Sequence, residues 1–114
     1  MEEFKHRKIK FKAWNTESHL LVRLNSIECK KGELFKTSHI LLQFTGLYDK
    51  EGEEVYDMDI VLMGYDKFLV FWNADKNGWY YSPLLRRDLQ ESFVAGVPEK
   101  MKRFCSHFEL QSTI

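Results

Sequence analysis

The fold is decided between residues 60 and 83, where the chain reads IVLMGYDKFLVFWNADKNGWYYSP. Two short turn sequences, Gly64-Tyr65-Asp66 and Asn77-Gly78, divide this stretch into three runs rich in β-branched and aromatic residues. Asn-Gly between two such runs is a strong hairpin signal, because both residue types accept positive φ angles. The stretch therefore predicts two consecutive antiparallel hairpins.

The same pattern continues outward on both sides of this stretch. Apolar and polar residues alternate in several segments, as expected for half-buried strands, and turn residues separate them. After Pro83, the spacing of Leu85, Leu89 and Phe93 predicts one or two helical turns, and residues 99–110 fit a helix and a strand equally well. The chain is therefore predicted to be mostly β and antiparallel, with few short helices. Strands are expected near residues 8–14, 19–27, 39–45, 54–63, 67–73 and 78–82.

Composition sets limits on the class of protein. The chain has 114 residues, of which 44% are hydrophobic, and equal numbers (17 each) of basic and acidic residues. This balance excludes a disordered tail, a histone-like basic protein and a collagenous chain. The longest apolar run, residues 68–72, is too short to span a bilayer, and no signal peptide is visible. Two distant cysteines, Cys29 and Cys105, are expected to be reduced thiols in a cytoplasm.

Charge is distributed unevenly along the chain. Residues 1–45 contain 9 Lys/Arg and 5 Asp/Glu, a net charge of +4, and residues 46–114 contain 8 and 12, a net charge of −4. Lys8, Lys10 and Lys12 form the core of the basic segment and are candidates for a phosphate-binding strip. They also alternate with Ile9 and Phe11, as a solvated strand face does. A third interpretation is contact between oppositely charged segments of two copies.

Motifs that carry chemistry are mostly absent. The sequence has no Gly-rich phosphate loop, no Cys-x-x-Cys, no His-Glu-x-x-His and no metal-ligand spacing among its four histidines. Cys105 and His107 would share a face of a strand, but one such pair lacks an orienting group and an oxyanion donor. No catalytic residue, metal ligand or cofactor is predicted, and the protein is not expected to be an enzyme.

The aromatic residues are candidates for an interface. Residues 60–63 and 68–72 are apolar on both strand faces, so both faces need cover. The cover could be the C-terminal segment, a second copy of the chain, or stacked nucleic-acid bases. Only Lys67 and Lys76 accompany this hairpin, which favours protein over nucleic acid. With the three basic-strip lysines, the candidate interface comprises Phe68, Phe71, Trp72, Trp79, Tyr81, Lys8, Lys10 and Lys12.

Residues 43–61, QFTGLYDKEGEEVYDMDIV, resemble the signature of the YopX family, small proteins encoded by phages and prophages. Residues 9–15 resemble the family's N-terminal strand, and residues 104–109 its closing strand, where Gly-Asn usually replaces Cys105-Ser106. The family usually has Gly at Met58, so the turn before Asp59 is expected to be altered. The resemblance implies a mostly β protein with a small SH3-like barrel, a strand over residues 102–109, a phage origin, and no established activity.

The resemblance also implies an organisation and a structural motif. A single YopX-like domain is expected over residues 1–114, with N-terminal strands at 1–45, barrel hairpins at 46–83 and a C-terminal segment at 84–114. Asp59 precedes an apolar run, so its carboxylate is expected to be partly buried and to accept backbone N–H groups of the bend, as a structural brace or as a ligand-binding group. The motif residues are Gln43, Thr45, Gly46, Asp49, Gly52, Tyr56 and Asp59.

Three function classes follow, in order of preference. The first is a phage accessory protein in the host bacterial cytoplasm that acts by binding, as a homo-oligomer, and inhibits a host enzyme or defence factor. The second is a small nucleic-acid-binding barrel that uses residues 5–12 and the aromatic hairpin. The third is a small hydrolase that uses Asp59, Cys105 or His107. The expected partners are a second copy and a host protein, with nucleic acid less favoured and no membrane.

Overall fold

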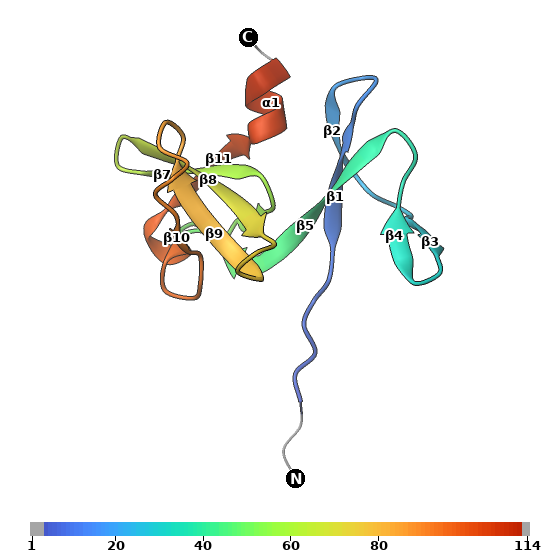
Figure 1. Cartoon of the computed structure of the whole chain (residues 1–114), viewed down its shortest axis with the longest axis horizontal. Helices are drawn as coiled ribbons and strands as arrows, with labels where there is room; N and C mark the ends of the chain where they lie inside the picture. The colour runs from blue at the N-terminus through green and yellow to red at the C-terminus, as the bar shows by residue number, and fades with distance from the viewer. Residues whose placement is uncertain (1–3, 113–114) are drawn as a thin grey trace.

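Residues 4–112 are described by a computed structural model, and strands make up most of their regular structure (Figure 1). No helix in this part of the chain is long and apolar enough to cross a membrane. The elements in chain order are β1 Phe11–Asn15, β2 Leu20–Arg23, β3 Glu28–Lys30, β4 Glu33–Phe35, β5 His39–Tyr48, β6 Glu54–Tyr56, β7 Asp59–Met63, β8 Asp66–Asn73, β9 Gly78–Pro83, β10 Glu91–Ser92, a 3₁₀ turn Pro98–Lys100, β11 Lys102–Ser106 and α1 His107–Ser112.

The strands form two main sheets and one two-stranded ribbon. The four-stranded sheet has the order β2-β1-β5-β6, the five-stranded sheet β10-β9-β8-β7-β11, and the ribbon is β3-β4. Every pairing is antiparallel, and one sheet forms a half-barrel. The predicted mostly β, antiparallel fold is therefore confirmed, while an SH3-like arrangement stays a prediction.

The long strand β5 connects the two halves of the molecule. Residues 39–43 pair with β1, and residues 44–48 pair with β6 across a register shift. In Figure 1, β5 runs from the N-terminal strands on the right toward the five-stranded sheet on the left. The strand expected at 39–45 is therefore longer than predicted, and it crosses residue 45, where the N-terminal segment was expected to end.

The two hairpins predicted for residues 60–83 are confirmed. β7 pairs with β8, and β8 pairs with β9 with Trp72 opposite Trp79 and Asn73 opposite Gly78. The second turn spans four residues, 74–77, and Asn77 takes the positive φ of 54°. The Asn73 side chain accepts the Lys76 backbone N–H at 3.0 Å, which stabilises this turn.

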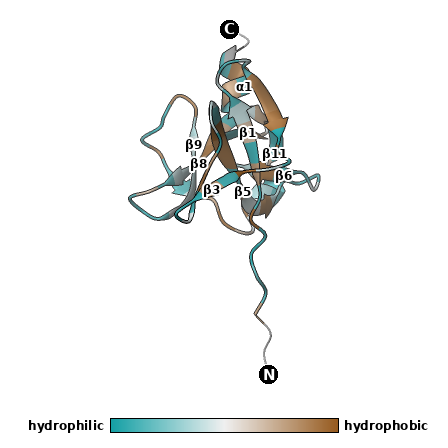
Figure 2. Ribbon diagram, turned by 90° about the vertical axis from the view of Figure 1, so that its right-hand side faces the viewer, coloured by the Kyte–Doolittle hydropathy of each residue, from teal (hydrophilic) through white to brown (hydrophobic). Residues whose placement is uncertain are grey.

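The C-terminal segment covers one face of the central strands. Phe93 and Met101 are buried in one cluster with Val55, Val61 and Val70. Ile60 and Leu69, on the same apolar runs, are also buried. Figure 2 shows hydrophobic residues concentrated in the strands and a mostly hydrophilic N-terminal segment. The chain's own C-terminal segment therefore provides one of the three covers considered for these runs.

Several predicted strand boundaries were wrong. The strand expected at 8–14 starts only at Phe11, and the one at 19–27 ends at Arg23. The strand expected at 54–63 is two strands, because residues 57–58 form a turn. Met58 has φ 65°, its N–H donates to Val70 O at 2.8 Å, and its carbonyl accepts His107 N–H at 2.7 Å. Methionine therefore makes the turn before Asp59 in the left-handed region.

The helix predicted for residues 84–93 was also wrong. Arg86 N–H donates to Pro83 O and Leu89 N–H to Arg86 O, so the segment makes separate turns before β10. Of the three residues at helical spacing, Leu85 and Leu89 are exposed and only Phe93 is buried. Without a common buried face, the spacing has no packing to stabilise a helix.

The strand expected at 102–109 ends at Ser106, where α1 begins. Ser106 N–H donates to Glu109 Oε1 at 2.9 Å, and Phe108 N–H donates to Ser106 Oγ at 3.4 Å. These reciprocal bonds are a capping box, which the pattern Ser-x-x-Glu encodes. This local signal was present in the sequence and overrides the strand that the family resemblance implied.

The left-handed conformation of Met58 leads to a first prediction. Replacement by Gly and by Ala removes the same side chain beyond Cβ, but only Gly accepts φ 65° without strain. We expect Met58→Gly to be more stable than Met58→Ala by about 1 kcal/mol, measured by urea unfolding. Lys67, an exposed residue of β8, is the control position, where the Ala variant should be more stable than the Gly variant. An Ala variant at 58 as stable as the Gly variant would contradict this.

Candidate functional site

Two carboxylates of the segment 43–61 are buried, and both accept several hydrogen bonds. Asp59, at the start of β7, is 1% exposed. Its Oδ2 accepts Tyr56 N–H at 2.9 Å and Arg103 Nε–H at 2.9 Å, and its Oδ1 accepts Arg103 Nη2–H at 3.4 Å. The expected bond from the bend's backbone is therefore present, together with a guanidinium partner that sequence reasoning missed.

Asp49 forms the second buried carboxylate and is 4% exposed. Its Oδ1 accepts the backbone N–H groups of Glu51 and Glu53, which closes the β5–β6 turn. Its Oδ2 accepts Arg103 N–H at 2.7 Å. Burial alone would raise the pKa of Asp49, but these three backbone N–H groups hold it below its usual value.

Arg103 is the partner that the two carboxylates share. The Asp49 carboxylate accepts the backbone N–H of Arg103, and the Asp59 carboxylate accepts a guanidinium N–H of the same residue. Both contacts lie where the register between β7 and β11 shifts. Burial raises the pKa of Asp59 despite the opposing effect of Arg103. We call these three residues the arginine clamp. No local pattern could have found Arg103, because its placement depends on the β7–β11 register.

The other motif residues also brace the β5–β6 hairpin. Thr45 Oγ1–H donates to Val55 O at 2.7 Å and accepts Leu47 N–H at 3.2 Å. Gln43 contributes its carbonyl oxygen, which accepts Asp57 N–H at 2.8 Å. Gly46 and Gly52 have φ of 86° and 82°, where a side chain would be strained. Six of the seven predicted motif residues therefore lie in the β5–β6 hairpin, and Asp59 is joined to it by the Tyr56 N–H bond.

A groove of about 490 Å³ lies beside the arginine clamp. It is lined by basic residues from β1, β2 and β11 and by residues of β6, among them the Tyr56 ring. Burial and the neighbouring Glu54 raise the pKa of Tyr56 to about 12. Lys10 and Lys12 line this groove, whereas Lys8 is exposed and does not line it. The predicted basic strip is therefore divided.

The aromatic candidates pack mainly against each other. Trp72 and Trp79 meet edge to face with ring centroids 5.1 Å apart, and Phe68 and Tyr81 do so at 5.5 Å. Phe68, Trp79 and Tyr81 also pack against the buried core, and Phe71 is half-buried. Trp72 is the candidate that remains exposed. Most of these rings therefore pack within this chain and do not form an exposed interface.

Cys105 and His107 do not share a strand face as expected. Cys105 lies in β11, while His107 begins α1. Burial raises the pKa of the Cys105 thiol, which disfavours the thiolate, and burial lowers the pKa of His107. Within residues 4–112, no group of three or more His, Cys, Asp or Glu side chains is arranged to hold a metal ion.

A family model matches most of the chain. The model, described as YopX protein, matches residues 1–97. No curated protein matches it. The match includes Asp49 and Asp59 and ends before β11, so Arg103 lies outside the matched residues.

The arginine clamp leads to a second prediction. Asp59→Asn and Arg103→Gln should each lower the free energy of unfolding by about 3 kcal/mol, because each separates a buried charge from its closest partner. The double variant should lose less than the sum, with a coupling energy of about 1–3 kcal/mol in urea unfolding. The exposed Arg86–Asp88 pair is the control, since Asp88→Asn should change stability by about 0.5 kcal/mol or less. Additive losses at 59 and 103 would contradict the clamp.

Asp57, in the turn between β6 and β7, leads to a third prediction. Burial, with a contribution from Asp59, raises the pKa of Asp57 from 3.8 to about 6. Its ionisation therefore destabilises the native state as pH rises from about 4 to about 6. Asp57→Asn has no carboxyl group to ionise at this site. The free energy of unfolding of this variant, relative to wild type, should therefore rise by about 1–2 kcal/mol between pH 4 and pH 6 and stay constant at higher pH.

Urea unfolding at a series of pH values measures this difference. Asp75→Asn, at an exposed site in the β8–β9 turn, is the matched control and should show no such change between pH 4 and 6. The assignment would be contradicted if the stability of Asp57→Asn relative to wild type stayed constant or fell as pH rises from about 4 to about 6.

Proposed function

This chain belongs to the YopX family, and from that premise we propose that it is a phage- or prophage-encoded accessory protein that acts by binding, not by catalysis. Its place of action would be the host bacterial cytoplasm. Its first partner would be a second copy of itself, and its target a host protein. The observation that supports binding is an exposed apolar surface at one end of the five-stranded sheet.

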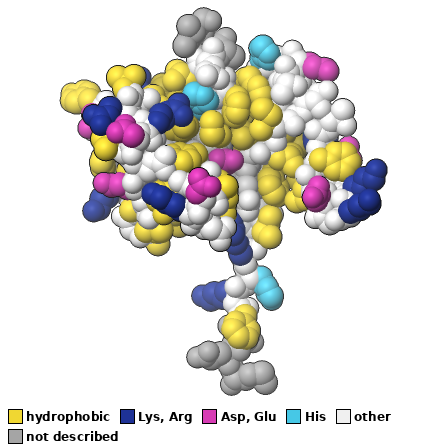
Figure 3. Space-filling model, in the orientation of Figure 1, with side chains coloured by type: hydrophobic (Ala, Val, Ile, Leu, Met, Phe, Trp, Pro, Cys, Tyr) yellow, Lys and Arg dark blue, Asp and Glu magenta, His cyan; other side chains and the backbone are white. Residues whose placement is uncertain are grey.

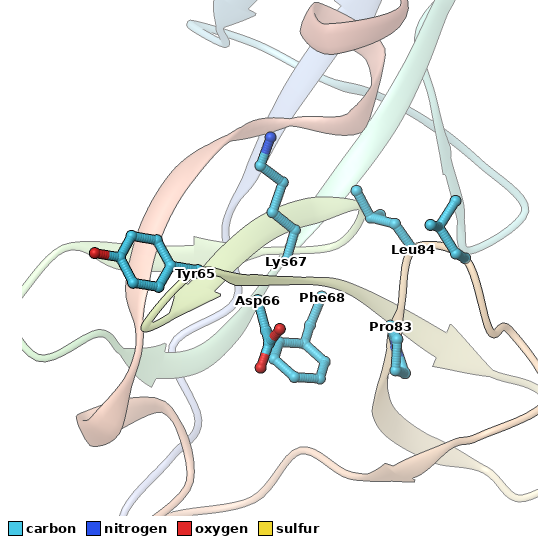
Figure 4. A pocket seen from close by; sticks show the side chains of 7 residues that line it. Tyr65, Asp66, Lys67, Phe68, Pro83 and Leu84 are labelled. Carbon is cyan, nitrogen blue, oxygen red and sulfur yellow. The ribbon is translucent and has the colours of Figure 1, made fainter.

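This apolar surface lies where the β7–β8 turn meets the chain that leaves β9. Tyr65 is fully exposed and Leu85 is 95% exposed. Two adjoining hollows of about 590 Å³ and 240 Å³ share Phe68 and Pro83. In Figure 4, Phe68 and Pro83 point to one side of the strand pair, and Lys67 and Leu84 to the other. We call this the turn surface; its apolar residues are Met63, Tyr65, Phe68, Pro83, Leu84, Leu85 and Leu89.

The charges around the turn surface favour a second copy as its occupant. The segments that form it, residues 63–68 and 83–91, carry three basic and three acidic exposed side chains, which we call its rim, so two identical surfaces would not repel each other. Figure 3 shows charged side chains of both signs beside hydrophobic ones at the left edge of the molecule. An isologous dimer requires such self-complementarity, and large exposed apolar patches commonly mark protein interfaces. The rim residues are Asp66, Lys67, Arg86, Arg87, Asp88 and Glu91.

The chemistry of the buried groups supports a non-enzymatic role. The Asp59 carboxylate is occupied by Tyr56 N–H and by Arg103, which leaves it poorly suited to act as a general base. The raised pKa of Cys105 opposes a nucleophilic thiolate. Asp59 and Cys105 were two of the three candidates for a small hydrolase, the third being His107.

Self-association provides the test and the fourth prediction. The monomer mass is 13.7 kDa, and we expect a larger mass for the wild type by light scattering at tens of micromolar. Leu85→Asp should weaken association by about tenfold or more, since it places a charge in the apolar contact without disturbing the core. Leu34→Asp, at a 46%-exposed site on β4, is the matched control and should associate like the wild type.

Two results would contradict the proposal. One is a wild-type mass of 13.7 kDa over this concentration range. The other is an association that Leu85→Asp and Leu34→Asp change equally, since the turn surface would then not be the contact.

A further inference from the structure

Two cations lie directly opposite each other at the edge of the four-stranded sheet. Lys12 of β1 pairs with Arg23 of β2 in the antiparallel register, which places both side chains on one face of the sheet. Like charges in this position destabilise a strand pair. Neither side chain forms an ion pair with any residue in the range 4–112. Asp59, Glu109 and Glu54 favour the charge of Lys12 from a distance, but none of them forms an ion pair with it.

The acidic residues nearby are already paired. Glu54 forms an ion pair with Lys10 and accepts Tyr56 Oη–H at 3.1 Å. Glu53 pairs with Lys102 at 3.3 Å. Asp59 holds the guanidinium of Arg103, as described above. Lys12 and Arg23 thus keep their positive charge in the groove, although Glu53 and Glu54 also line it.

The surroundings of Lys12 favour binding of an anion. Its Nζ lies 4.5 Å from the centre of the Tyr56 ring, and the side chain is half-buried. Burial and the charge of Arg103 lower the pKa of Lys12, against the opposing effect of Asp59, Glu109 and Glu54. A cation that is partly desolvated and close to two arginines gains from a bound anion more than an exposed surface lysine does.

The groove also offers apolar contacts and enough room for a small ligand. Phe11, Leu24 and Tyr56 contribute to its walls. Its volume of about 490 Å³ lies within the range of ligand pockets, about 300–1,000 Å³. Arginine binds phosphate through two parallel N–H groups and lysine as a point charge. A base or sugar could lie against the apolar walls while the cations hold the phosphate.

We propose that the groove between β1, β2, β6 and β11 binds a phosphate group of a nucleotide or of a single-stranded nucleic acid, with Lys12 and Arg23 as its principal ligands. The two sources share one chemistry and differ in the length of chain bound. This site is separate from the turn surface, so it does not depend on self-association.

The test uses two probes at about 50 mM NaCl, where electrostatic binding is strong. ATP is titrated by calorimetry, and a fluorescein-labelled dT12 oligonucleotide by anisotropy. Lys12→Gln and Arg23→Gln should each weaken binding of the bound probe by about tenfold. Lys30→Gln, an exposed lysine on β3, is the matched control and should bind like the wild type.

The outcomes identify the source of the phosphate. If ATP binds and displaces the oligonucleotide, the ligand is a free nucleotide. If only the oligonucleotide binds, the ligand is a nucleic-acid strand. In that case the magnitude of the slope of log K against log salt concentration should be smaller by about 1 in each variant than in the wild type.

The proposal is overturned if neither probe binds the wild type at about 1 mM, or if both Gln variants bind as tightly as the wild type. Urea unfolding checks the fold of the variants. Because Arg23 is exposed and opposes another cation, Arg23→Gln should be at least as stable as wild type. Arg23→Gln therefore gives a clear answer even if Lys12→Gln unfolds.

Discussion

The arginine clamp is the interaction on which the rest of the C-terminal structure depends. Two buried carboxylates, from opposite ends of one hairpin segment, hold the backbone and the side chain of a single residue. Removing three charged groups from water is expensive, and their attraction offsets this only when geometry and hydrogen bonding are good. Here Asp49 also accepts two turn N–H groups and Asp59 accepts Tyr56 N–H, so each carboxylate is held by its own hairpin as well as by Arg103.

The clamp fixes the position of β11, and several contacts follow from it. Met101, two residues before Arg103, enters the buried core, and its carbonyl accepts Lys50 N–H at 2.9 Å. Beyond β11, the Phe108 ring stacks on Trp14 of β1 with centroids 5.7 Å apart. The C-terminal strand and helix therefore contact both halves of the molecule, and Arg103 becomes a wall of the groove that also contains Lys12 and Arg23.

The features that could be predicted from the sequence are local. Asn-Gly and the Asp49–Gly52 turn identified their hairpins, because turn residues act through their own backbone. The position of Asp59 before an apolar run indicated a buried brace. The Ser-x-x-Glu capping box was equally local, and reading it would have placed the start of α1. In contrast, residues 84–93 had helical spacing without a buried face, so spacing alone was misleading.

The features that could not be predicted depend on contacts between distant segments. Arg103 meets Asp59 across 44 residues, and Lys12 faces Arg23 only because β1 and β2 pair in one particular register. A shift of one residue in either pairing would turn these side chains to the other face. Strand register is set by the whole packed structure, so no local motif in this chain reported either contact.

Native-state hydrogen exchange at the Arg103 backbone amide tests the central claim most directly. This N–H donates to the buried Asp49 carboxylate at 2.7 Å. If the clamp fixes β11, the amide should exchange only on global unfolding, with the same opening free energy as the amides of β7 and β8. Exchange through a much smaller opening free energy, while β7 and β8 stay protected, would show that β11 opens on its own and would contradict the account.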